Sequence, residues 1–186
     1  MKSDTEEIVA KARDAFLNLM IGDIRRAFYG KSKVGAMLLS LCAIDTLGCY
    51  YADKPKGKPI KEDNAKHFRR FVADYMDESY KPIADKLFGA LRCFLVHGYT
   101  TKDFDLIDGE PHLHLQKRLS SGGERQMINV DTFIDDVEKA TKKYLDALEK
   151  DSSVLSNFKI QFADAGLMTV YQVRVPVPVA DSSNGT

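Results

Sequence analysis

The sequence has no tryptophan, only three cysteines and no excess of charge of either sign. Cys42, Cys49 and Cys93 are odd in number, show no CxxC spacing and lie within apolar helical patterns. They therefore indicate reduced, buried thiols rather than a disulfide framework or a zinc site. Lysine plus arginine and aspartate plus glutamate both number 27, so no overall electrostatic field indicates nucleic acid, a membrane or an acidic partner. Any charged partner must be bound by a local patch.

Long apolar runs are also absent by inspection, because no continuous stretch of about 18 apolar residues, the length of a membrane span, occurs. The first residues, MKSDTEEIVAKARD, mix acids and bases without the apolar centre of a signal peptide. We therefore expect a cytoplasmic protein without a membrane partner. A chain of 186 residues, 44% hydrophobic and 29% charged, has the composition of one compact globular domain.

Five segments repeat apolar residues at the spacing of a helix. The second, VGAMLLSLCAIDTLGCYYA, is apolar around its whole circumference, which predicts a central position. The fourth has Pro82 in its first turn and stops at Gly98, and Asp131 is expected to cap the fifth. The predicted helices span 5–28, 34–52, 62–75, 81–97 and 132–150, and a short helix or turn is expected around 154–158.

Two regions have the alternating pattern of strands. FDLID, HLHLQK and RQMINV predict a small hairpin or three-stranded flap, with turns at Gly109 and at Gly122-Gly123. The last stretch, LMTVYQVRVPVPVADSSNGT, is β-like up to Pro176 and Pro178, which favours an edge strand or an extended arm. We thus predict a mainly all-α fold, an antiparallel up-and-down bundle of four to five helices in domain 1–160. A β insertion at about 103–130 follows the fourth helix, and 161–186 form a C-terminal extended arm.

The fourth predicted helix ends in ALRCFLVHGYT, where Arg92 and His97 interrupt an apolar run. In a regular α-helix they lie about 140° apart, on the two borders of one face. The face between them carries small side chains at Gly89 and Cys93, together with Val96. A second subunit can approach such a face closely, and a symmetric contact would place two copies of the pair around one cleft. The opposite face is expected to be core, formed by Ile83, Ala84, Leu87, Phe88, Leu91, Phe94 and Leu95.

Arginine and histidine together suit phosphate chemistry. The guanidinium of Arg92 would stabilise charge on phosphorus, while neutral His97 would activate a ribose 2′-hydroxyl or protonate the leaving oxygen, without a metal. The alternative is that both are ordinary bases at a helix C-terminus, where they interact with the last carbonyls. Asp45, in the apolar second helix, needs a buried partner, which is either Arg92 or another base.

The motif Arg-x4-His within RCFLVHGY resembles that of the HEPN superfamily (higher eukaryotes and prokaryotes nucleotide-binding domain), including the form with Tyr two positions after the His. AIDTLG in the second predicted helix, LFGALR before the motif and the hairpin and helix after it extend the resemblance over residues 5 to 150. It implies an all-α fold that dimerises at the motif, and a metal-independent endoribonuclease of a toxin-antitoxin or antiviral defence system. Arg92 and His97 are then catalytic, with Tyr99 as a supporting residue. Asp45 is a further supporting candidate because of the pairing with Arg92 considered above, not because of the resemblance.

The resemblance also implies partners. In some toxin members the motif tyrosine, here Tyr99, is modified by a nucleotidyltransferase-type antitoxin, which is therefore a possible partner besides RNA and a second copy of the chain; no DNA is expected. Cys93 departs from the polar residue, often Asn, Asp or His, that usually follows the motif arginine. Some family members are inactive, so the alternative is a silent HEPN-like dimer that binds RNA, a nucleotide or a protein.

Two other groups of residues are candidate sites. Basic residues around the third predicted helix could follow an RNA backbone, with Phe68 or Tyr75 for stacking, or simply form a solvated surface. His112 and His114, near Glu110, would share one strand face like paired metal ligands, but further ligands are missing, and we expect neither metal nor cofactor. The basic set is Lys54, Lys56, Lys58, Lys61, Lys66, Arg69 and Arg70.

Overall fold

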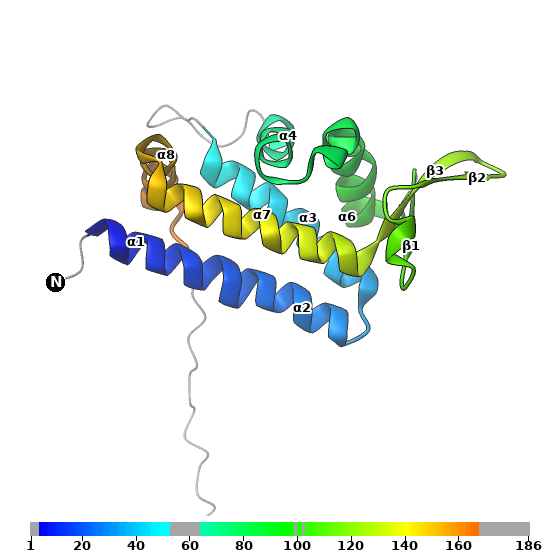
Figure 1. The fold of residues 1–186 in the computed structure, drawn as a ribbon, viewed down its shortest axis with the longest axis horizontal. Helices are drawn as coiled ribbons and strands as arrows, with labels where there is room; N and C mark the ends of the chain where they lie inside the picture. The colour runs from blue at the N-terminus through cyan, green and yellow to red at the C-terminus, as the bar shows by residue number, and fades with distance from the viewer. Residues whose placement is uncertain (1–3, 53–63, 99, 102, 168–186) are drawn as a thin grey trace, which may run out of the picture.

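A computed structural model of the chain describes residues 4–52, 64–98, 100–101 and 103–167. These residues form a mainly helical fold with one small β-sheet, as the sequence predicts at that level (Figure 1). Lys54, Lys56, Lys58, Lys61 and Tyr99 lie outside the described residues, as does the predicted arm from residue 168 onward.

The first predicted helix is one continuous rod made of α1 (Asp4–Arg13), the π-helical segment η1 (Asp14–Ile21) and α2 (Gly22–Tyr29). Its apolar stripe is buried as expected, with Phe16 and Ile24 almost without exposure. The π winding was not predicted, because it leaves no signal in apolar spacing as short as this. The rod lies alongside α7 and runs in the opposite direction (Figure 1).

Helix α3 (Lys33–Tyr51) is the centre of the fold, as its apolar circumference predicts. It packs against α2, α4, α7 and α8, and Met37, Leu41, Ile44 and Leu47 are completely buried. Contrary to our expectation, this helix is long and apolar enough to cross a membrane, judged by length and composition alone. The contacts with these neighbouring helices account for its apolar character, because they bury apolar residues on several of its sides.

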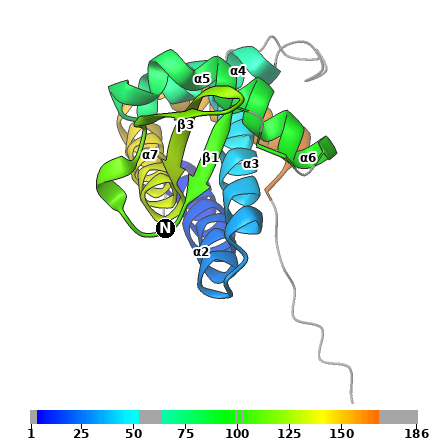
Figure 2. The ribbon, with the colours of Figure 1, turned by 90° about the vertical axis from the view of Figure 1, so that its right-hand side faces the viewer.

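The next two helices pack on α3 and lie above α3 and α7 in the view of Figure 1. Helix α4 (Asn64–Tyr75) is seen nearly end-on in Figure 1 and crosses above α3 in Figure 2. The fourth predicted helix is a continuous series: η3, a 3-10 helix (Glu78–Ile83), α5 (Ala84–Lys86), the π-helical η4 (Leu87–Cys93) and α6 (Phe94–Gly98). It begins earlier than predicted, because Asp77 caps η3 by accepting a hydrogen bond from Ser79 N–H at 3.0 Å. We call this series the motif helix.

The β insertion follows the motif helix and leads into α7. Strand β1 (Phe104–Ile107) pairs in parallel with β3 (Gly123–Asn129), which pairs antiparallel with β2 (Lys117–Ser120), giving the order β1-β3-β2. FDLID and RQMINV are therefore strands as predicted, with a tight turn before Gly123. HLHLQK is not a strand: Pro111–Leu113 form the 3-10 turn η5, and only Lys117 enters β2.

Two helices complete the described chain. Helix α7 (Val130–Lys150) is capped by Asn129, whose Oδ1 accepts from Thr132 N–H at 2.9 Å, so the prediction that Asp131 is the cap is wrong. Asn129 is the last residue of β3 and also the N-cap of α7, because its side-chain oxygen accepts a hydrogen bond from the first turn of the helix. Helix α8 (Ser152–Ala165) is longer than the short helix expected and takes in residues 161–165, which were expected to be extended.

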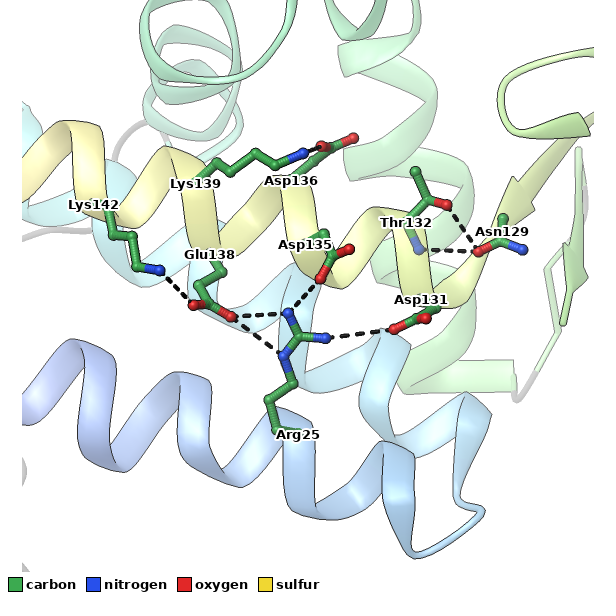
Figure 3. A network of polar contacts seen from close by, with 9 residues as sticks. All are labelled: Arg25, Asn129, Asp131, Thr132, Asp135, Asp136, Glu138, Lys139 and Lys142. Carbon is green, nitrogen blue, oxygen red and sulfur yellow. Dashed lines mark hydrogen bonds and ion pairs between the residues drawn. The ribbon is translucent and has the colours of Figure 1, made fainter. Parts of the chain in front are cut away.

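Arg25 joins the first rod to α7 (Figure 3). Its guanidinium contacts Asp135 at 2.5 Å, Glu138 at 2.8 Å and Asp131 at 3.4 Å, with 22% of its side chain exposed. Hydrogen bonds from Lys142 and Arg25 lower the pKa of Glu138. The network explains why Asp131 does not serve as a cap: its carboxylate reaches towards α2.

Replacing Arg25 by methionine is expected to lower the free energy of unfolding by about 1–2 kcal/mol, because three acids on α7 lose a shared and partly buried cation. Arg26→Met is the matched control. Arg26 pairs only locally with Asp23, and its side chain is 66% exposed, so its loss should change stability by less than about 0.5 kcal/mol. Urea denaturation of both variants at low and high salt measures the difference, and equal losses would contradict this role of Arg25.

Candidate functional site

Arg92 lies at the end of η4 and forms an ion pair with Asp45 of α3. Arg92 Nη2 donates to Asp45 Oδ2 at 2.8 Å, and 26% and 13% of the two side chains are exposed. The pairing that the sequence left open is therefore confirmed. Burial acts to lower the pKa of Arg92, but the charge and hydrogen bond of Asp45 outweigh it and raise that pKa. Arg92 is thus a fixed, permanently charged group at a helix surface.

The packing of the motif helix agrees with the predicted core face. Ile83, Ala84, Leu87, Leu91 and Leu95 are buried, and Phe88 is partly buried. The opposite side carries half-buried Gly89 and Cys93. His97, in α6, is exposed. The arrangement leaves Arg92 anchored and His97 accessible on the same end of one helix.

The π winding of η4 changes the predicted angle between these two side chains. A π-helix bonds residue i to i+5, so each residue turns less about the axis than in an α-helix. The interval from Arg92 to His97 begins in η4 and ends in α6. Because only Arg92 and Cys93 of this interval lie in η4, the separation is slightly smaller than the 140° or so expected for a regular α-helix, and the two side chains still border one face.

The hydrogen bonding of the ion pair is incomplete. Within the described part of the chain, Arg92 Nε and Asp45 Oδ1 are buried without a hydrogen-bond partner. Buried polar atoms are nearly always bonded, and an unmade bond costs about 1–3 kcal/mol. The guanidinium has five N–H donors in a fork that matches phosphate oxygens. Besides the buried Nε–H and the Nη2–H that Asp45 accepts, the fork has further N–H donors for a bound anion or for a partner subunit.

Cys42 belongs to the surroundings of this pair but was not singled out from sequence. It lies three residues before Asp45 on α3, and the charges of both Arg92 and Asp45 reach its thiol. Burial raises the pKa of Cys42, so the group is a neutral thiol near pH 7. The i to i+3 relation of Cys42 to Asp45 was the available signal, because such residues share a helix face.

The predicted basic patch is described only on α4, where Lys66, Arg69 and Arg70 are exposed. Arg69 contacts Asp85 at 2.6 Å, and Arg70 contacts Asp74 at 3.7 Å, so these two cations have acidic partners. Because α4 packs against both α3 and η4, the three cations lie on the element next to Arg92.

The aromatic residues proposed for base stacking are not available. Phe68 is fully buried, with its ring 5.4 Å from that of Phe88, and Tyr75 is 9% exposed within a cluster of aromatic rings. Both lie on the apolar face of α4, which packs inward. The spacing of apolar residues predicted this helix, but it did not show which elements the apolar face packs against. The prediction that either residue stacks on RNA is therefore wrong.

His112 and His114 do not form a paired face. His112 is exposed near Glu110, whereas His114 is half-buried against the motif helix. Asn129 N–H donates to His114 Nδ1 at 3.1 Å, so Nε2 carries the proton of the neutral ring and faces the Tyr80 hydroxyl at 2.7 Å. That hydroxyl donates to Asp136 Oδ2 at 2.8 Å. Among the described residues, no group of three or more His, Cys, Asp or Glu side chains could hold a metal.

This chain of hydrogen bonds predicts an acid-sensitive stability. Burial lowers the pKa of His114 in the folded chain, although Asp136 opposes the shift. The folded state then binds fewer protons than the unfolded state, so the stabilisation is complete above about pH 6.5 and is lost as the pH falls through the lowered folded value. Protonated His114 also cannot accept from Asn129 N–H.

We expect the melting temperature of wild type to fall more between pH 7 and pH 5 than that of His114→Gln. His112→Gln, a change at an exposed side chain, is the control and should follow wild type. Thermal melts followed by circular dichroism measure the effect, and parallel pH dependences for all three proteins would exclude His114 as its source.

Comparisons with known proteins add nothing to this geometry: no protein family, curated protein or solved structure matches the chain.

Proposed function

We propose that this protein is a metal-independent endoribonuclease of the HEPN type, in which Arg92 and His97 cleave RNA at the interface of a homodimer. The observation that carries the proposal is the anchoring of Arg92 by Asp45 at 2.8 Å, five residues before an exposed His97 on the same helix end. An ordinary basic helix end needs no buried acid from another helix. We further propose the helical bundle of that superfamily, a cytoplasmic location and a role in toxin-antitoxin or antiviral defence.

The chemistry follows from the two groups. The neutral imidazole of His97 takes the proton of a ribose 2′-hydroxyl as its oxygen attacks the neighbouring phosphorus. Negative charge then develops on the phosphate oxygens, where the remaining N–H donors of Arg92 stabilise it. The bond from phosphorus to the 5′-oxygen breaks and that oxygen takes up a proton. The products are a 2′,3′-cyclic phosphate and a 5′-hydroxyl end.

Asp45 acts as a positioning residue in this scheme. It uses one nitrogen of the guanidinium and fixes the plane of the fork, so that Arg92 needs no reorientation when RNA binds. Lys66, Arg69 and Arg70 on the adjacent α4 supply positive charge for the RNA backbone. Lys54, Lys56, Lys58 and Lys61 would extend that charge, and Tyr99 would serve as the target of a nucleotidyltransferase-type antitoxin.

The test is incubation of structured and single-stranded RNA with the full chain in EDTA. We expect wild type to release fragments with 2′,3′-cyclic phosphate ends, and Arg92→Ala to lower the rate by about 10²-fold or more. Arg26→Ala, which removes an exposed arginine of α2, is the control and should cleave like wild type. RNA that is equally stable with all three proteins would exclude the proposed activity.

A second candidate is a silent HEPN-like dimer that binds RNA, a nucleotide or a protein partner. Cys93 favours it, because this thiol follows Arg92, interacts with its guanidinium and replaces a polar residue of the motif. Salt-dependent RNA binding by wild type, without cleavage, would identify this alternative.

A further inference from the structure

An apolar pocket of about 570 Å³ opens between the first rod, α3 and the end of α8. Its large apolar lining residues include Phe16, Leu19, Met20, Leu39 and Tyr50. Its volume lies in the range of ligand-binding cavities, which are mainly apolar with a few polar groups. Those groups include Asp23, Cys42 and Thr46. The pocket is distinct from the cations of α4 and from His97.

The mouth of the pocket exposes apolar surface. Leu39 keeps 40% of its surface exposed, although it lies on α3, the helix that packs against four others. Only Tyr29 and Leu119 among the described large hydrophobic residues are also exposed to this extent. Together with the apolar wall, the exposed part of Leu39 gives an open apolar surface on which another apolar group can pack.

The chain itself leaves from the wall of this pocket. Helix α8 ends at Ala165, and Gly166, with a φ of +68°, turns the backbone there. The Tyr50 hydroxyl donates to the Gly166 carbonyl, and both Gly166 and Leu167 line the pocket. Gly166 and Leu167 thus bring the backbone to the pocket, where the Tyr50 hydroxyl holds the Gly166 carbonyl.

We propose that this pocket is the docking site of the chain's own segment 168–179, which lies outside the described residues. Tyr171, Val173, Val175, Val177 and Val179 occupy alternate positions, so in an extended segment they share one face. The alternate positions hold Gln172, Arg174, Pro176 and Pro178, a polar or proline-bearing side suited to solvent. Because Leu167 lies at the pocket, docking is intramolecular, at an effective concentration in the millimolar range.

Segment 168–179, docked in this pocket, would lie near the ion pair of Arg92 and Asp45. Cys42 lines the pocket and lies within the field of Arg92 and Asp45. Segment 168–179 would thus cover the apolar flank of that site. This docking does not depend on any ribonuclease activity.

Cross-linking in the full chain tests the proposal. Cys42 is a natural probe in the pocket wall, so Val173→Cys should form a disulfide with it under a mild oxidant at alkaline pH. Ser182→Cys, in the polar end beyond the segment, is the control. Peptide mapping by mass spectrometry should find at least about ten times more linkage to Cys42 from position 173 than from 182, and little linkage to Cys49 or Cys93.

Hydrogen exchange gives a second reading that needs no cysteine. In wild type the amides of 168–179 should exchange several-fold more slowly than those of 181–186, and Leu39→Arg at the exposed mouth should remove the difference. Equal linkage from positions 173 and 182, or protection that Leu39→Arg leaves intact, would overturn the proposal. Linkage found only between two chains would overturn it as well, because the occupant would then be a second copy's segment.

Discussion

His97→Ala is expected to slow RNA cleavage by about 10²- to 10⁴-fold, the range in which a general acid or base contributes. The neighbouring guanidinium of Arg92 cannot replace it, because it stays protonated and cannot accept the hydroxyl proton. The side chain is exposed, so its loss should change the free energy of unfolding by less than about 0.5 kcal/mol. His97→Ala is therefore expected to lower the cleavage rate without lowering the stability of the fold.

The measurement is the single-turnover rate on a defined RNA in EDTA, with thermal melts of the same samples. His112→Ala removes another exposed histidine, on the β insertion, and should cleave at the wild-type rate. Asp45→Asn keeps the shape of the anchor but not its charge, and should fall between wild type and Arg92→Ala. A His97→Ala protein that keeps more than about a tenth of the wild-type rate would remove this residue from the mechanism.

Gly48→Ala is expected to lower the free energy of unfolding by about 2–3 kcal/mol, the upper range for overpacking. A Cβ at Gly48 would lie 2.7 Å from the carbonyl oxygen of His67 and 2.9 Å from its carbonyl carbon. These are backbone atoms of α4 and cannot rotate away, so the two helices would have to move apart. Phe68, fully buried directly after His67, would lose packing in the same movement.

Thermal and urea denaturation measure this loss, which corresponds to a melting temperature about 4–12 °C lower for a chain of this length. Gly122→Ala, in the turn between β2 and β3, is the control, because a Cβ there would lie 4.0 Å from Ser120 Oγ, an ordinary contact. A surface substitution of this kind should change the free energy of unfolding by less than about 0.5 kcal/mol. Equal melting temperatures for the two variants would contradict the close approach of α3 and α4.

Much of the fold could be predicted from the sequence, because apolar spacing determines which side of a helix is buried. The five long helical segments, the central position of α3 and the buried face of the motif helix all follow from that spacing. The failures have local causes. HLHLQK alternates like a strand, but Pro111 and the φ of +49° at Glu110 impose a 3-10 turn.

The site was predictable to a different degree. The spacing of Arg92 and His97 singled them out as a candidate pair. The cost of a buried acid required a partner for Asp45 and left open whether it was Arg92 or another base, and the structure shows that Arg92 is that partner. The prediction that Phe68 and Tyr75 are available for stacking was wrong, because both side chains are buried. An amphipathic pattern shows that one face of a helix is buried, but it does not show which aromatic residues belong to that face. The hydrogen bonds from His114 to Tyr80 and from Tyr80 to Asp136 join residues far apart in the chain, and no sequence pattern predicts such contacts.

The π-helical segment η4 has a consequence for how such sites change between related chains. A π segment is equivalent to an α-helix that has gained one residue, and deleting one residue restores α winding. The wider π turn takes up the extra residue, so a deletion before Arg92 within η4 would leave the spacing to His97 unaltered and would change the direction of both residues relative to Leu87 by only a small fraction of a turn. The six-residue motif would keep its neighbours, Asp45 among them. This helix end can therefore tolerate the gain or loss of one residue upstream of the motif without giving up the anchoring of Arg92.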